Sequence, residues 1–160
     1  MELQRRPVYL SGGEGRSLWM LDSLITFKLT GEETDGALAL VDSWVMPHSG
    51  PPLHIHERED ETFYVIEGEF EFLAGEATIR VGAGSVVYGP RGIPHTYRNT
   101  GDGAGRFLTL ITPAGFEGFF RELGEPVSDP SEPPPVTSGK IKKMLTISPR
   151  YGITFPPPDA

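Results

Sequence analysis

The chain contains no cysteine among its 160 residues. Disulfides, thiolate metal sites, iron–sulfur clusters and cysteine nucleophiles are therefore excluded. Positive charge is scarce, because 14 Lys and Arg residues face 22 Asp and Glu residues and give a formal net charge of −8. Such a balance lacks the basic footprint of proteins that bind nucleic acid or anionic membranes. We therefore expect no nucleic acid and no membrane among its partners.

Long apolar segments are also missing from the sequence. No apolar run approaches the roughly 18 residues that a membrane-spanning helix needs. Residues 1–7 have no apolar core and so do not resemble a secretory signal. Together with the absence of cysteine, these features favour a cytoplasmic protein. The apolar share of 38% is sufficient for one packed domain at this length.

Glycine and proline are abundant: the 20 glycines and 16 prolines make up 22.5% of the 160 residues. Average usage of the two together is about 12%. This composition favours short strands joined by tight turns. Residues 31–36 are expected to form a polar loop, and Gly68 a bulge or turn. A strand spacing of about 8–12 residues predicts an all-β antiparallel sandwich or barrel. The expected strands are residues 18–21, 24–30, 37–46, 62–73, 77–81, 85–88, 95–99 and 106–112.

The pattern changes after residue 112. Residues 116–123 carry apolar side chains at helical spacing, and Gly124 follows as a C-cap. Residues 138–148 predict a second helix that ends at Pro149. Residues 151–155 are expected to form a last strand-like segment.

The same change divides the chain at residue 124. Residues 1–124 are expected to form the barrel with its N-terminal strands, and residues 125–160 a proline-rich connector and a C-terminal helix. A helix of about ten residues is marginal alone. We therefore expect this tail to pack on the barrel or on a neighbouring subunit.

Histidines provide the candidate site. His54 and His56 alternate, so in a strand both imidazoles point to one face. Glu61 can join them only if a turn through residues 57–60 intervenes, and His95 only if the sheet folds over. Three imidazoles and one carboxylate suit Fe, Mn, Co, Ni, Cu or Zn better than Ca or Mg. The His-x-His pair alone is weak support, because most such pairs bind no metal.

Two segments resemble the motifs of the cupin superfamily. Residues 50–61, followed by Gly68, resemble its first motif, G-x5-H-x-H-x3–4-E-x6-G, except that only three residues separate Gly50 from His54. Residues 84–99 resemble its second motif, G-x5-P-x-G-x2-H-x3-N, without a departure. The resemblance covers roughly residues 38–112.

The resemblance implies a jelly-roll β-barrel with His54, His56, Glu61 and His95 as ligands of one divalent transition metal. The helical tail is similar to that of bacterial single-domain cupins, some of which resemble flavonol (quercetin) dioxygenases. Relatives are commonly dimers, so we expect a homodimer. A divalent ion, three neutral imidazoles and one carboxylate leave about one positive charge, which favours an anionic chelating ligand.

The leading hypothesis is an oxygenase that acts on a chelating aromatic or enolisable small molecule. Glu61 would serve as a ligand and, on loosening, as the catalytic base for a substrate hydroxyl. Phe63 and Val65 share strand parity with Glu61, and Tyr97 shares it with His95, so these three are expected to line a substrate pocket. Small barrels also fill their interiors with such side chains, which leaves a packing role open.

Two other functions stay open on the same site. An isomerase, decarboxylase or lyase would need the same fold and ligands. A non-catalytic small-molecule-binding cupin would bind without conversion. DNA-binding cupins generally carry a helix-turn-helix ahead of the barrel, whereas the first 40 residues here are predicted as strands. Outside the cluster, His48 is expected at the surface, Asn99 in a hairpin turn, and residues 57–60 in a solvated loop.

Overall fold

The structure, a computed structural model, describes residues 6–157. Its helices are α1 (Gly31–Thr34), α2 (Glu117–Leu123), α3 (Ser138–Ile147) and the short 3₁₀-helix η1 (Ser148–Tyr151). Its strands are β1 (Arg16–Met20), β2 (Ser23–Leu29), β3 (Ala39–Val45), β4 (Ile55–His56), β5 (Asp60–Glu67), β6 (Phe70–Ala74), β7 (Ala77–Val81), β8 (Val86–Gly89), β9 (His95–Asn99), β10 (Gly105–Thr112), β11 (Glu125–Pro126) and β12 (Ile153–Thr154).

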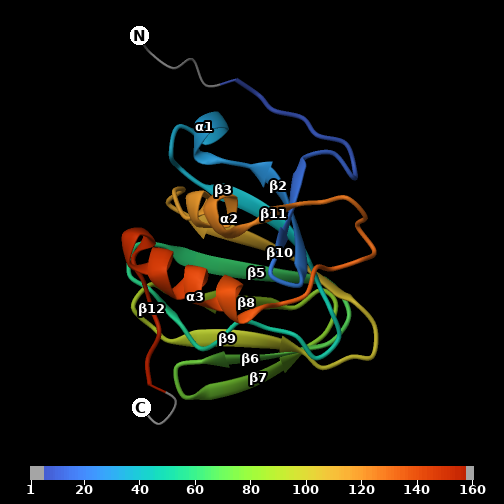
Figure 1. The fold of residues 1–160 in the computed structure, drawn as a ribbon. Helices are drawn as coiled ribbons and strands as arrows, with labels where there is room; N and C mark the ends of the chain where they lie inside the picture. The colour runs from blue at the N-terminus through green and yellow to red at the C-terminus, as the bar shows by residue number, and fades with distance from the viewer. Residues whose placement is uncertain (1–5, 158–160) are drawn as a thin grey trace.

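The strands form two facing layers. Within residues 6–157, the larger sheet has the order β11-β1-β2-β3-β10-β5-β8, and its strand pairs are antiparallel. The sheet β7-β6-β9 and the pair β12-β4 form the second layer, and a β-bridge between His54 and His95 joins them. Figure 1 shows β6, β7 and β9 at the end of the molecule opposite β1 and β2. The predicted all-β jelly-roll class with a short C-terminal helical extension is confirmed.

The predicted polar loop at residues 31–36 is wrong in part, because it contains helix α1. Thr30 caps this helix, and its side chain accepts a hydrogen bond from the backbone N–H of Glu32. The carboxylate of Glu33 in turn accepts one from the backbone N–H of Thr30 at 2.7 Å. This reciprocal capping box satisfies donors that a short helix otherwise leaves unpaired.

Two predicted helix ends also differ from the structure. Pro149 does not end the C-terminal helical segment but lies in the first turn of η1, where its missing N–H is not needed. Gly124 is the C-cap of α2, yet its backbone is extended rather than left-handed. A Cβ at Gly124 would lie 2.5 Å from the carbonyl oxygen of Phe120, so close packing explains the glycine.

The C-terminal tail packs on the sheet of its own chain. Met144 and Ile147 of α3 and Ile153 of β12 are buried in one cluster with Ile25 and Val41 of the larger sheet. Helices α2 and α3 lie side by side against this end of the sheet (Figure 1). The tail therefore forms part of the hydrophobic core.

The tail also pairs with the strand that carries the histidine pair. Ile153 of β12 is opposite His56 of β4, and the backbone N–H of Glu57 donates to the carbonyl of Gly152 at 2.9 Å. Arg58 donates to the carbonyl of Arg150 at 3.0 Å. These bonds fix β4 from its outer edge.

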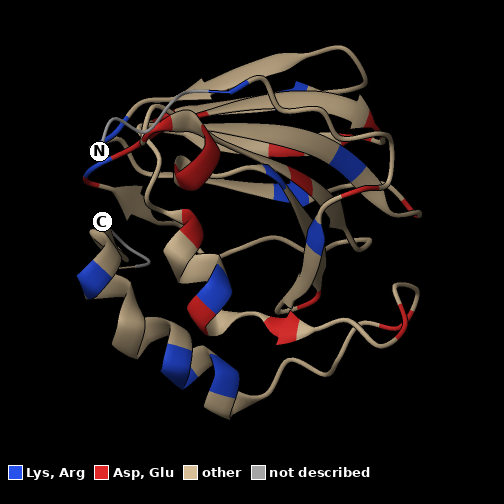
Figure 2. Ribbon diagram, turned by 90° about the horizontal axis from the view of Figure 1, so that it is seen from above, with Lys and Arg blue, Asp and Glu red and all other residues tan. Residues whose placement is uncertain are grey.

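Charge is distributed unevenly over the described residues. Figure 2 shows Lys and Arg along the C-terminal helix α3, whereas Asp and Glu are scattered over the sheets and loops. Lys140 of α3 pairs with Glu125 at 2.5 Å, which ties the helix to the connector. Among residues 6–157, no helix has the length and apolar character needed to cross a bilayer.

Candidate metal centre

Four side chains from both layers meet at one point. His54 directly precedes β4, His56 lies in β4, Glu61 lies in β5 of the larger sheet, and His95 begins β9. One ligand atom from each of the four residues lies within 4.8 Å of the others. The sheet does fold over as His95 requires, and the predicted turn separates His56 from Glu61. The structure thus brings together the four residues that the sequence selected.

Two imidazoles are oriented by backbone carbonyls. Nδ1 of His54 lies 2.8 Å from the carbonyl oxygen of Pro52, and Nδ1 of His95 lies 3.3 Å from that of Ile93. A carbonyl oxygen only accepts hydrogen bonds, so each Nδ1 carries the hydrogen. In both rings Nε2 is therefore the nitrogen that could bind a metal.

The carboxylate of Glu61 lies between the other two rings. Its Oε2 is 2.8 Å from Nε2 of His95 and 3.3 Å from Nε2 of His56. His56 is 1% exposed, His95 2% and Glu61 5%. Such buried charged and polar groups need one another or an ion as partners.

Glu59 is a site residue that the sequence analysis missed, because the solvated-loop prediction is wrong at this position. It is only 5% exposed, and its Oε2 lies 3.7 Å from Nδ1 of His56. These two atoms are buried, and neither has a hydrogen-bond partner within residues 6–157. The signal was its parity with Glu61 two residues later, which the run of charged residues obscured. Glu59 thus occupies, beside Nδ1 of His56, the position that a backbone carbonyl occupies beside Nδ1 of His54 and of His95.

The protonation of the cluster follows from burial and proximity. Burial, strengthened by the neighbouring His95 and His56, lowers the pKa of His54 to about 4. Burial alone would lower the pKa of His56, but the carboxylates of Glu61 and Glu59 raise it to about 9. Burial likewise opposes ionisation of Glu61, yet His56 and His95 hold its pKa well below the usual range.

The donor set fits a divalent transition metal. Three imidazole nitrogens and one carboxylate oxygen are ligands that first-row transition ions accept, whereas calcium takes six to eight oxygens. The rings are already oriented, with Nδ1 of His54 and His95 bound to the chain and Nε2 of His56 and His95 facing Glu61. His54, His56, Glu61 and His95 could therefore hold one such ion.

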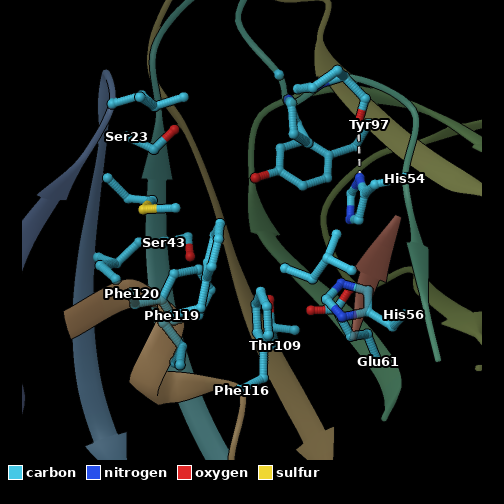
Figure 3. Close-up of a pocket in the computed structure, with 18 of the residues that line it drawn as sticks. Ser23, Ser43, His54, His56, Glu61, Tyr97, Thr109, Phe116, Phe119 and Phe120 are labelled. Carbon is cyan, nitrogen blue, oxygen red and sulfur yellow. Dashed lines mark hydrogen bonds and ion pairs between the residues drawn. The ribbon is translucent and has the colours of Figure 1, made fainter. Parts of the chain in front are cut away.

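A largely apolar cavity opens from this cluster (Figure 3). Its volume is about 110 Å³, which is room for several water molecules or a small ligand. Phe63 and Tyr97 line it, and the hydroxyl of Tyr97 points into the cavity (Figure 3). Burial, with Glu61 and Asp22 nearby, raises the pKa of Tyr97 above its usual range, so this hydroxyl stays protonated.

Val65 differs from the other two predicted pocket residues. It is fully buried in the cluster with Phe70 and Phe72 and is not among the side chains that line the cavity. The reason is its place on β5, two residues beyond Phe63, where aromatic rings fill the closed end of the barrel. Strand parity predicted the face of Val65 correctly but not its depth.

Sequence reasoning also missed the part of the cavity wall that comes from the C-terminal segment. Phe116, directly before helix α2, and Phe119 and Phe120 within it lie on the cavity, and the tail adds Met144 and Ile153. The helical spacing of these phenylalanines was visible in the sequence, but their direction depends on how α2 packs. The cavity is therefore closed by both the barrel and its C-terminal extension.

Two further polar residues behave as expected. His48 is exposed, and Nε2 of its ring lies 3.9 Å from the carboxylate of Asp102, outside the cluster. Asn99 is fully buried at the end of β9, and its side chain bonds to the turn that follows: its Nδ2 donates to the carbonyl of Gly103 at 2.8 Å, and its Oδ1 accepts from the N–H of Gly101 at 2.9 Å. Asn99 therefore stabilises the hairpin before β10.

The sequence of this chain is similar to those of known proteins. A family model described as a cupin domain matches residues 43–111. Quercetin 2,3-dioxygenase from Bacillus subtilis (strain 168) is 30% identical over 142 residues, which are 87% of this chain and 42% of that enzyme. The chain thus spans less than half the length of this curated relative.

Solved structures support the fold. An RmlC-like cupin from Shewanella frigidimarina NCIMB 400 has a TM-score of 0.61 at 18% identity. The superposition covers 72% of this chain and 99% of that cupin. A predicted oxalate decarboxylase from Thermotoga maritima has a TM-score of 0.54 at 28% identity, with 57% of this chain and 80% of its own covered. The first of these likenesses concerns the fold alone.

Proposed function

We propose that this chain, which is similar to cupin domains and to quercetin 2,3-dioxygenases, is a metal-dependent cupin oxygenase. Its substrate would be a small chelating molecule, aromatic or enolisable, that binds as an anion. The observation that carries this proposal is the cavity whose one end is the cluster of His54, His56, Glu61 and His95 and whose walls are aromatic. A divalent ion held by this cluster would supply Lewis-acid and redox chemistry when bound.

The chain's own residues have separate tasks in this proposal. Glu61 is ionised, because its pKa is held low, and its carboxylate can accept the proton of a substrate hydroxyl. Tyr97 keeps its proton and can donate a hydrogen bond to the resulting anion. Phe63 and Phe116 flank this end of the cavity, where they exclude water and contact an aromatic ring.

A decarboxylase is the second candidate function. The likeness to a predicted oxalate decarboxylase favours it, and the same four ligands would serve it. The cavity supports an aromatic substrate better than a small diacid, because its walls carry phenylalanines rather than cationic side chains. Dependence on oxygen separates the two candidates.

The test is a parallel aerobic and anaerobic assay of flavonol bleaching with protein loaded with Fe, Mn, Co or Ni. We expect turnover with at least one metal in air and none without oxygen. Turnover of a carboxylic acid under argon would favour the decarboxylase. Absence of oxygen-dependent turnover with all four metals and a panel of chelating aromatics would contradict the proposal.

Replacement of Glu59 by glutamine is expected to weaken metal binding by about 10- to 100-fold, because outer carboxylates orient histidine ligands and raise their basicity. The 3.7 Å approach to Nδ1 of His56 motivates this prediction. Competition with a chromophoric chelator measures the affinity for Co²⁺ or Zn²⁺. Glu57→Gln, an exposed change on the same loop, is the matched control and should bind as wild type. Equal affinity in both variants would contradict a role for Glu59.

A further inference from the structure

We propose that the cavity contains a second recognition site, a hydroxyl row formed by Thr109, Ser43 and Ser23, which binds a polar group at the far end of a flat ligand. This inference rests on the proposed function, because the near end of the same ligand would be chelated at the cluster of Glu61 and the three histidines. All three hydroxyl residues line the cavity. Figure 3 shows Ser23 and Ser43 across the cavity from His54 and His56.

The strand register sets the direction of the row. Glu61 is opposite Ile111 and Phe63 is opposite Thr109, so Glu61 and Thr109 are diagonal neighbours on the inner face of β5 and β10. Diagonal cross-strand neighbours lie about 7–8 Å apart. The first step of the row therefore begins directly beside the cluster.

The same diagonal continues over the next two strands. Val41 is opposite Thr109 and Ser43 is opposite Phe107, so Ser43 of β3 is the next diagonal neighbour. Ile25 of β2 is opposite Ser43, and Ser23 lies two residues from Ile25 on the same face. Polar atoms thus cross β5, β10, β3 and β2 in one line, on a sheet face that is otherwise apolar.

Two members of the row present hydroxyl groups to the cavity without a hydrogen-bond partner in the described part of the chain. Ser43 and Thr109 are each 6% exposed, and the structure gives neither hydroxyl a side-chain hydrogen bond within residues 6–157. The other buried hydroxyls, of Thr30 and Ser148, do bond to the chain. A hydroxyl on the wall of a largely apolar cavity can form its hydrogen bonds only with what the cavity holds. Its place on the cavity therefore points to a ligand that supplies the missing bond.

Aromatic side chains beside the row favour a flat ligand. Phe116, Phe119 and Phe120 line the cavity, and Figure 3 draws Phe119 and Phe120 near Ser43 and Phe116 near Thr109. Aromatic side chains pack favourably against a flat aromatic ring. The class that fits is a planar aromatic chelator with a hydroxyl or carbonyl group remote from its chelating end. A two-carbon diacid at the cluster is too short to reach Ser43.

The test compares two ligands that share the 3-hydroxy-4-oxo chelating pair and differ in the hydroxyl groups outside it, 3-hydroxyflavone and quercetin, with zinc-loaded protein under argon. Wild type is expected to bind quercetin about tenfold more tightly than 3-hydroxyflavone, as one or two added hydrogen bonds allow. The double variant Ser43→Ala/Thr109→Val should lose this preference and keep its affinity for 3-hydroxyflavone. Fluorescence titration measures both affinities without turnover.

The matched control is Thr62→Val on the outer face of β5, which should keep the wild-type preference. Retained affinity for 3-hydroxyflavone shows that the double variant is folded. A double variant that still prefers quercetin, or a wild type that binds both flavonols equally, overturns the hydroxyl row alone. A wild type that binds neither flavonol overturns the proposed substrate class and the row with it.

Discussion

Replacement of His56 or His95 by alanine is expected to reduce bound metal from about one ion per chain to background. Each change removes one of four donors and leaves the carboxylate of Glu61 without its imidazole neighbour at 3.3 or 2.8 Å. A buried acid that loses its partner is destabilised in its charged form, so both the ligand and its charge balance are lost. Elemental analysis of protein purified without a chelating tag measures the effect.

His48→Ala is the control for these variants, because His48 is exposed and outside the cluster. It should retain the wild-type metal content. Thermal unfolding gives a second readout, since a ligand that binds only the folded state at a thousandfold excess over its Kd adds about 4 kcal/mol of stability. Zinc should therefore raise the melting temperature of wild type and of His48→Ala but not of His56→Ala. Full metal content in the cluster variants would refute the assignment of the site.

Replacement of Gly50 by alanine is expected to destabilise the fold by about 3 kcal/mol, the upper end of the usual cost of overpacking. A Cβ at this position would lie 1.8 Å from the carbonyl oxygen of Tyr97, which belongs to the backbone of β9. Backbone cannot rotate away as a side chain can, so the segment before His54 must separate from β9. Chemical denaturation measures the loss.

Gly82→Ala is the matched glycine control, because no atom lies within 4 Å of a Cβ built there and its backbone is not left-handed. It should change stability little. The Gly50 variant should in addition bind metal more weakly, because His54 follows four residues later and bonds through its backbone to His95. Wild-type stability in Gly50→Ala would show that the segment shifts at no cost.

The sequence was sufficient to predict the strands and the four clustered side chains, because both depend on short-range patterns. Alternation of apolar residues specifies a strand wherever one face is buried, and β7 and β9 have the predicted bounds. The spacing of His54, His56 and Glu61 depends on one turn, and the motif resemblance supplied His95. These inferences require no knowledge of which distant surfaces meet.

The features that sequence reasoning missed depend on distant contacts or on ambiguous local chemistry. Glu59 has the same charged character as its neighbours in the sequence, and it is buried because the turn between β4 and β5 brings it beside His56. Gly50 departs from the motif spacing, and its need for glycine comes from Tyr97, 47 residues later. Helix α1 was obscured because its cap, Thr30, also suits a turn.

The pairing of β12 with β4 has a consequence for how substitutions can change the ligand that the cavity accepts. Ile153 and Phe155 contribute to the cavity wall, although the cupin match ends at residue 111. A fragment trimmed to the matched region would lose this wall and the strand beside His56. Conversely, substitutions in the tail can reshape the cavity while the sheet hydrogen bonds and the four clustered side chains stay as they are. The C-terminal segment thus offers descendants of this chain a route to new ligands that leaves the barrel unaltered.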